Sequence, residues 1–111
     1  MKVWEDLTVN EKTLVKRAVE AMLRMGETQV IFEKKDGTMR VAQSTLQGRV
    51  ISEKIGDEGL QKEINPAKPR RESIESCRFF ELTDGKNQWR SFSMDKLISI
   101  GGNKIADLIR I

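Results

Sequence analysis

Trp89 and Arg90 are neighbouring residues whose side chains suit the recognition of a nucleic acid. An indole ring can stack on a nucleobase, and a guanidinium group can bind a phosphate. Because successive side chains of a strand point to opposite faces, we expect Trp89 and Phe92 on opposite faces of a sheet unless a bulge intervenes. Trp89 then either contacts a partner or packs beneath an N-terminal helix, since tryptophan is usually mostly buried.

Basic residues elsewhere in the chain are further candidates for contact with phosphates or with a protein partner. Besides Trp89 and Arg90, the candidate binding residues are Lys34, Lys35, Arg40, Arg70, Arg71 and Lys86. The sequence has 20 Lys plus Arg against 17 Asp plus Glu, which gives a net charge of +3. This small excess is spread along the chain, so a nucleic-acid surface would have to be assembled by the fold.

The residue types that most often perform catalysis are scarce. The chain has no His and one Cys, which excludes a Ser-His-Asp or Cys-His pair, an internal disulfide and a Cys/His zinc site. It contains no P-loop, dinucleotide-binding turn, nucleophile elbow or calcium loop. We therefore expect no catalytic residue, no metal, no cofactor and no enzymatic activity.

Length and composition predict one small domain that spans residues 1–111. Hydrophobic residues make up 38% of the chain and charged residues 33%, which suits a modest core under a heavily charged surface. No apolar run approaches the roughly 20 residues that cross a bilayer, so we expect no membrane partner. Cys77 is expected to be a buried, reduced thiol in a cytoplasmic protein.

Residues 8–25 show the clearest helical pattern. Thr8 and Glu11 have the spacing of a capping box, and Gly26 is a typical stop signal. The expected apolar stripe consists of Leu14, Val15, Ala18, Met22 and Met25. The basic residues off this stripe either contact a phosphate backbone or form an ordinary solvated face, and they are Lys12, Lys16, Arg17 and Arg24.

Two hairpins follow from the alternation of strand-forming residues and turn signals. The first spans residues 28–46, and its turn residues Asp36 and Gly37 are expected there for backbone geometry. The second occupies the start of residues 76–100, with strands at 77–83 and 88–93 and a turn at Asp84-Gly85.

A tight turn at 94–96 is expected to lead into a last strand at 97–100, where Gly101-Gly102 ends it. Asn103 could cap a short C-terminal helix over residues 103–110.

Residues 47–75 form a long polar connection that contains both prolines of the chain. Helical turns are plausible at 49–55 and 58–64. Connections of more than about 15 residues without structure are uncommon in compact domains. This connection is therefore either a mobile solvated loop or a functional loop that orders on binding.

The order of these elements predicts an α+β fold. The expected architecture is a small SH3-like or Sm-like five-stranded barrel with an N-terminal helix, a long inserted loop and a short C-terminal helix.

Two segments resemble a known family. The first is a KKDGTMR run at 34–40 followed by STL at 44–46, and the second combines DGK at 84–86, WRSF at 89–92 and LISI at 97–100. They are similar to a family of small Sm-like SH3 barrels related to the WYL domain and encoded mainly by tailed bacteriophages. The resemblance implies a phage or mobile-element origin, a cytoplasmic setting and a binding role.

Two functions of different classes remain open at this point. The first is an accessory or regulatory protein that associates with nucleic acid through an aromatic platform and basic loops. The alternative is a protein–protein interaction module that binds and inhibits or redirects a host or phage protein. Self-association into a homo-oligomer through a sheet edge or the C-terminal helix is compatible with either.

Overall fold

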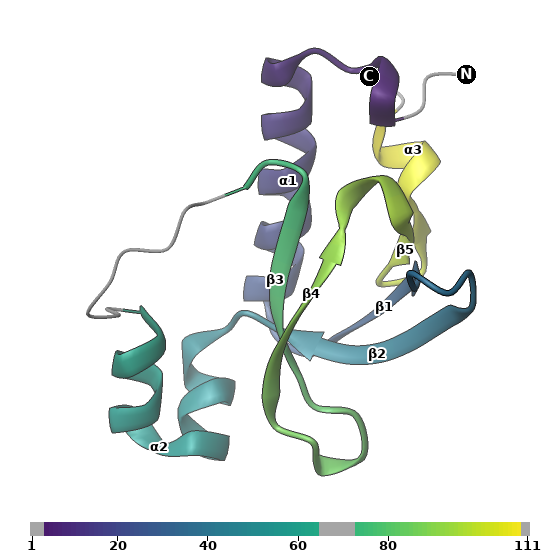
Figure 1. Cartoon of the computed structure of the whole chain (residues 1–111). Helices are drawn as coiled ribbons and strands as arrows, with labels where there is room; N and C mark the ends of the chain where they lie inside the picture. Colours follow the sequence, from purple (N-terminus) through teal and green to yellow (C-terminus); the bar gives the residue numbers. More distant parts are fainter. Residues whose placement is uncertain (1–3, 65–72, 110–111) are drawn as a thin grey trace.

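The structure, a computed structural model, describes residues 4–64 and 73–109, and of residues 57–64 and 108–109 it describes the backbone only. Helices and strands are mixed along the chain, as the sequence predicts (Figure 1). In order, the elements are η1 (Trp4–Asp6), α1 (Val9–Arg24), β1 (Thr28–Glu33), β2 (Met39–Thr45), α2 (Gly48–Ile64), β3 (Ser76–Glu81), η2 (Thr83–Gly85), β4 (Gln88–Ser93), η3 (Met94–Lys96), β5 (Leu97–Ile100), β6 (Asn103–Lys104) and α3 (Ile105–Ile109).

The strands form one antiparallel sheet in the order β4-β3-β2-β1-β5-β6. All five predicted strands are present, but the sheet is open and has a sixth strand at Asn103–Lys104, so the five-stranded barrel is not confirmed in that form. Asn103 pairs with Ile100 instead of capping a helix, because the two glycines at 101–102 turn the chain back onto β5. The C-terminal helix accordingly begins at Ile105 and not at residue 103.

The predicted N-terminal helix is confirmed as α1. Thr8 Oγ1 accepts a hydrogen bond from Glu11 N at 3.2 Å, and Glu11 Oε1 accepts one from Thr8 N at 2.9 Å, which completes the capping box. The C-terminal end of α1 is tied to β2, because Thr45 Oγ1 donates to the carbonyls of Leu23 and Gly26 at 3.2 and 2.9 Å. This contact fixes where the first hairpin leaves the helix.

The expected apolar stripe of α1 is confirmed only in part: Val15 is buried and Met22 packs against the core, but Leu14, Ala18 and Met25 are exposed. The buried apolar side chains are Val15, Val19 and Leu23, whereas Leu14 is 60% and Met25 82% exposed. Apolar residues occupy two neighbouring rows of this helix, so the sequence pattern alone did not single out the row that the sheet covers.

The core lies between α1 and the inner face of the sheet. α1 packs against β2 and β3, and its apolar row belongs to one hydrophobic cluster with side chains from the strands β1 to β5. The strand residues of this cluster are Val30, Ala42, Cys77, Phe79, Phe92, Leu97 and Ile100. Trp4 of η1 and Leu7, which follows it, join the same cluster.

The connection predicted as a long loop at 47–75 contains a helix, α2, in its first part. The helix is kinked at Gly56, whose φ of 81° and ψ of 160° are not helical. A left-handed φ suits glycine because it has no Cβ. The two halves of α2 agree with the helical turns expected at 49–55 and 58–64, and Figure 1 shows them as a bent pair at one side of the sheet.

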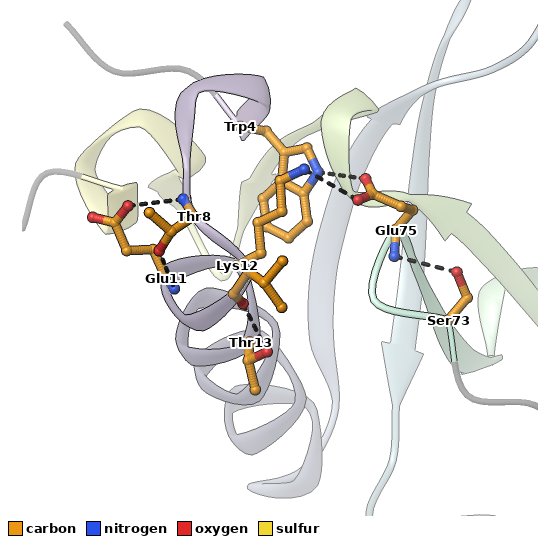
Figure 2. A network of polar contacts seen from close by, with 8 residues as sticks. Trp4, Thr8, Glu11, Lys12, Thr13, Ser73 and Glu75 are labelled. Atoms are coloured by element: carbon orange, nitrogen blue, oxygen red, sulfur yellow. Dashed lines mark hydrogen bonds and ion pairs between the residues drawn. The ribbon is translucent and has the colours of Figure 1, made fainter.

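The N-terminal segment is held to the segment before β3 by a polar network (Figure 2). Glu75 accepts hydrogen bonds from Trp4 Nε1 at 2.8 Å and from Lys12 Nζ at 3.1 Å, one on each carboxylate oxygen. Lys16 Nζ donates to the Ser73 carbonyl at 2.6 Å. Residues far apart in the sequence therefore join at one end of α1.

Candidate functional site

A cavity of about 520 Å³ lies between the tip of the first hairpin and the strands of the second. In the described part of the chain, the two hairpins pair at Ser44 with Glu81 and at Thr45 with Phe80, and the Gln43 carbonyl accepts a hydrogen bond from Leu82 N at 2.7 Å. Beyond these contacts the strands of the two hairpins diverge (Figure 1). We call this cavity the hairpin pocket, and its lining residues are Phe32, Glu33, Lys34, Lys35, Asp36, Arg40, Ser76, Phe79, Glu81, Arg90, Ser91, Phe92, Ser93 and Lys96.

Three phenylalanines form the apolar floor of the hairpin pocket. The rings of Phe32 and Phe92 are stacked with centroids 5.4 Å apart, and Phe79 lies 6.0 Å from Phe32 and 5.7 Å from Phe92. Phe79 and Phe92 are 1% and 4% exposed, whereas Phe32 is only half-buried. The ring that a ligand in the pocket can reach is therefore that of Phe32.

A buried carboxylate between two arginines forms the polar wall. Strand alternation places Glu81 on the same face of β3 as Phe79, and Arg90 on the same face of β4 as Phe92. The Glu81 side chain is 1% exposed, and it forms ion pairs with Arg40 and, at 3.4 Å, with Arg90 Nε. A buried carboxylate is stable only when it is paired in this way.

Three exposed lysines, Lys34, Lys35 and Lys96, surround this wall. Asp36 belongs to the turn, because its Oδ1 accepts hydrogen bonds from Thr38 N at 3.0 Å and Thr38 Oγ1 at 2.6 Å. These two hydrogen bonds lower the pKa of Asp36 below its ordinary value. The pocket lining thus has five basic and three acidic side chains, the acidic ones being Glu33, Asp36 and Glu81.

Four of the eight predicted binding residues come together in the hairpin pocket: Lys34, Lys35, Arg40 and Arg90. Lys86 and Trp89 do not line it. Arg70 and Arg71 lie outside the described residues. Trp89 and Arg90 are neighbours in the sequence, but alternation along the strand places their side chains on opposite faces of the sheet. Arg90 therefore lines the pocket and Trp89 does not.

Trp89 lies on the outer face of the sheet, as the alternation predicts. The core cluster under α1 includes Phe92 and not Trp89, so the interpretation that Trp89 packs beneath the N-terminal helix was wrong. Its ring packs edge-on against Phe80 at 5.5 Å, and the Arg78 guanidinium lies 4.1 Å from its centroid. Within the described part of the chain, the buried Trp89 Nε1 has no hydrogen-bond partner.

The basic residues of α1 mostly contact the protein itself. Lys12 is paired with Glu75, Lys16 is buried against Ser73, and Arg24 lies 3.9 Å from Glu20. The hypothesis of a basic helix for a phosphate backbone therefore loses Lys12 and Lys16, whereas Arg17 and Arg24 stay exposed.

Sequence reasoning did not find Phe32, Glu81 or Lys96 as site residues. Phe32 and Glu81 lie in strands whose inner side chains look like ordinary core positions, so only the divergence of the hairpins makes them line a cavity. Lys96 belongs to η3, which the sequence analysis predicted as a tight turn without a binding role for any of its side chains. A weak signal was available, namely an acidic residue on the core-facing row of β3.

Among the side chains that the structure describes, in residues 4–56 and 73–107, no group of three or more carboxylate or Cys side chains could hold a metal ion. Within the same part of the chain, no helix is long and apolar enough to cross a membrane. Cys77 is buried and unpaired, and burial raises the pKa of its thiol to about 12.

Comparison with known proteins places these observations in a family. Residues 16–98 match WYL_2, described as having an Sm-like SH3 beta-barrel fold. The chain belongs to this WYL_2 family. The match includes every residue that lines the hairpin pocket, and it confirms the family resemblance of the two hairpins.

A relative of this WYL_2 protein is encoded by a bacteriophage. The chain is 32% identical over 104 residues to a protein of Enterobacteria phage T4 described as an uncharacterized 11.5 kDa protein in the Gp31-cd intergenic region. The alignment covers 94% of both chains. No solved structure matches this WYL_2 chain.

Proposed function

We propose that this WYL_2 protein is a non-enzymatic, phage-type accessory or regulatory protein that associates with nucleic acid in the host cytoplasm. The observation that carries the proposal is the convergence of Lys34, Lys35, Arg40, Arg90 and Lys96 around one aromatic-floored pocket. With Glu33, Asp36 and Glu81 in the same lining, the pocket has a net charge of +2, compared with +3 for the whole chain.

The chemistry of the hairpin pocket suits a ligand with phosphates and flat rings. Lysine ammonium groups on a rim attract phosphates at long range, and arginine binds them with directed N–H donors. An accessible phenyl ring offers a surface on which a base can stack regardless of its identity. The two properties together are typical of association with a strand of nucleic acid.

The proposal is tested by fluorescence anisotropy with labelled 15-nucleotide DNA and RNA strands over a series of salt concentrations. Binding at low salt is expected, with an affinity that falls steeply as salt rises because phosphate contacts release counterions. Replacement of Lys34, Lys35 and Lys96 by Ala should weaken binding and reduce the salt slope by about two units for a single strand.

The matched control replaces Arg17, Lys54 and Lys104 by Ala. These three residues are exposed, lie outside the hairpin pocket and carry the same total charge. Affinity and salt slope should change much less in this variant. No binding of either strand at low salt, or an equal effect of the two triple variants, would contradict the proposal.

An exposed apolar patch on the outer face of the sheet favours a second candidate function. Val41 is 47% and Met39 66% exposed, and Ile31 lies beside Val41 on the same face. Such a patch suits a module that binds and inhibits or redirects a host or phage protein. Capture from nuclease-treated host lysate of a stoichiometric protein, lost on Val41→Glu and kept in the lysine triple variant, would favour this candidate.

A further inference from the structure

The hairpin pocket is closed at its base by side chains of the core. Phe79 and Phe92 are 1% and 4% exposed, and both belong to the hydrophobic cluster beneath α1. A ligand therefore enters from one side and ends on Phe32. A volume of about 520 Å³ is within the range of sites that hold one small molecule, so only a short part of a strand fits inside.

The polar wall is positioned for an anion next to the phenyl floor. Glu81 holds Arg90 through its Nε, while the Arg90 side chain remains 48% exposed. A guanidinium group has five N–H donors, so this contact leaves most of them for a ligand. Arg40 is held by the same carboxylate and is 26% exposed. The buried Glu81 thus fixes two cations and leaves Arg90 as the more accessible one.

We propose, on the basis of the proposed function, that the hairpin pocket admits a single unpaired nucleotide. Its base stacks on Phe32, and its phosphate contacts Arg90 and Lys96. A base within a duplex is already stacked and paired, so it cannot reach Phe32 unless it leaves the helix. A blunt duplex can offer only its phosphates to the lysines of the rim, which makes an unpaired strand or strand end the preferred ligand.

The bound nucleotide could be part of a strand or a free mononucleotide, and the following experiment distinguishes the two. Anisotropy is measured with a labelled ten-nucleotide single strand, the blunt duplex of the same sequence, and that duplex with a three-nucleotide overhang. A nucleoside 5′-monophosphate is added as competitor in each case. The single strand and the overhang should bind about ten-fold more tightly than the blunt duplex. The mononucleotide should displace both, and a mononucleotide affinity equal to that of the strand would identify the free nucleotide as the ligand.

Phe32→Leu removes the ring and keeps an apolar side chain at the floor. It should lower the affinity for the single strand about ten-fold, to the level of the duplex, and leave duplex binding unchanged. The matched control is Phe80→Leu, which alters a buried ring on the opposite face of the sheet. Both variants are compared below their melting temperatures, so that loss of fold is not mistaken for loss of binding.

A second measurement needs no core substitution. Amide chemical-shift changes in the unaltered protein on addition of the mononucleotide should centre on Phe32, Arg90 and Lys96. The inference is overturned if the shifts lie elsewhere, or if Phe32→Leu binds the single strand as tightly as the unaltered protein. In that case a loss of binding in the lysine triple variant would still support the proposed function, whereas absence of any nucleic-acid binding would reject both.

Discussion

Glu81 is the residue on which the candidate site depends most. Its side chain is 1% exposed and joins Arg40 of the first hairpin to Arg90 of the second. A carboxylate at such a position must be paired, because an isolated charge is expensive to bury. The pair therefore sets the distance between the two hairpins and the direction of both guanidinium groups.

Replacement of Arg40 by Leu should lower the free energy of unfolding by about 1–3 kcal/mol. It leaves the buried Glu81 with Arg90 as its remaining charged partner, at 3.4 Å. Urea denaturation measures the change, and Arg49→Leu at an exposed position is the control. The double variant Arg40→Leu, Glu81→Leu should lose less than the sum of the single losses. Additive losses would show that the two side chains do not interact.

Cys77 should resist thiol reagents while the protein is folded. The pKa of its thiol is raised to about 12, first by burial and then by the nearby Glu20 carboxylate. A thiol whose pKa is raised on folding stabilises the fold below its unfolded pKa, near 9, and this contribution is lost as the pH rises toward 12. Labelling by iodoacetamide at pH 8 should therefore require unfolding, and rapid labelling of native protein would contradict this account.

At the scale of elements, the sequence signals at the helix start and in the turns correctly predicted where the elements lie. The capping box of Thr8 and Glu11 formed as predicted, because both partners lie within one turn of each other. The strand at 88–93, the tight turn at 94–96 and the strand at 97–100 also have their predicted bounds. Local hydrogen bonding and strand propensity are enough to place such elements.

Thr8→Ala should destabilise the protein by about 1 kcal/mol, since it removes the side-chain cap of α1. Thermal unfolding followed by circular dichroism gives the change. The control is Thr13→Ala, which removes a hydrogen bond to the Val9 carbonyl inside the helix but no cap. A loss no greater than that of the control would show that the cap contributes little.

The contact of Glu75 with the N-terminal segment should make stability depend on acid pH. Hydrogen bonds from Trp4 and then from Lys12 lower the pKa of Glu75 below its ordinary 4.5. A carboxylate with a lowered folded pKa stabilises the protein above its unfolded pKa, and this contribution is lost as the pH falls through the folded value. Glu75→Gln should reduce the loss of stability between pH 5 and pH 3, whereas Glu53→Gln, at an exposed residue, should leave it unchanged.

At the scale of the whole molecule, the structure joins distant parts of the chain. The hairpin pocket draws residues from Phe32 to Lys96, and Trp4 reaches Glu75 across 71 positions. No local sequence pattern predicts either the pocket or the hydrogen bond between Trp4 and Glu75. The diffuse positive charge of the sequence becomes a cluster of five basic residues only because two hairpins diverge from a short paired segment.

Trp4 should contribute to global stability far more than its position near the start of the chain suggests. It is 3% exposed within the main core. Trp4→Ala should cost about 3–5 kcal/mol, because it removes a large buried ring. Trp4→Phe, which loses the hydrogen bond to Glu75 and keeps a ring, should cost less. Urea denaturation of both measures this difference, and equal costs would assign the effect to the hydrogen bond alone.

The sequence by itself determined the elements whose causes are local: the capped helix, the turns at Asp36-Gly37 and Asp84-Gly85, and the strands of the two hairpins. Only the tertiary structure decided which apolar row of α1 is buried, that Trp89 packs on Phe80, and that Glu81 holds two arginines. These features depend on how the sheet twists and where its hairpins separate. Residues far apart in the sequence come into contact there, and the spacing of residues along the chain does not predict such contacts.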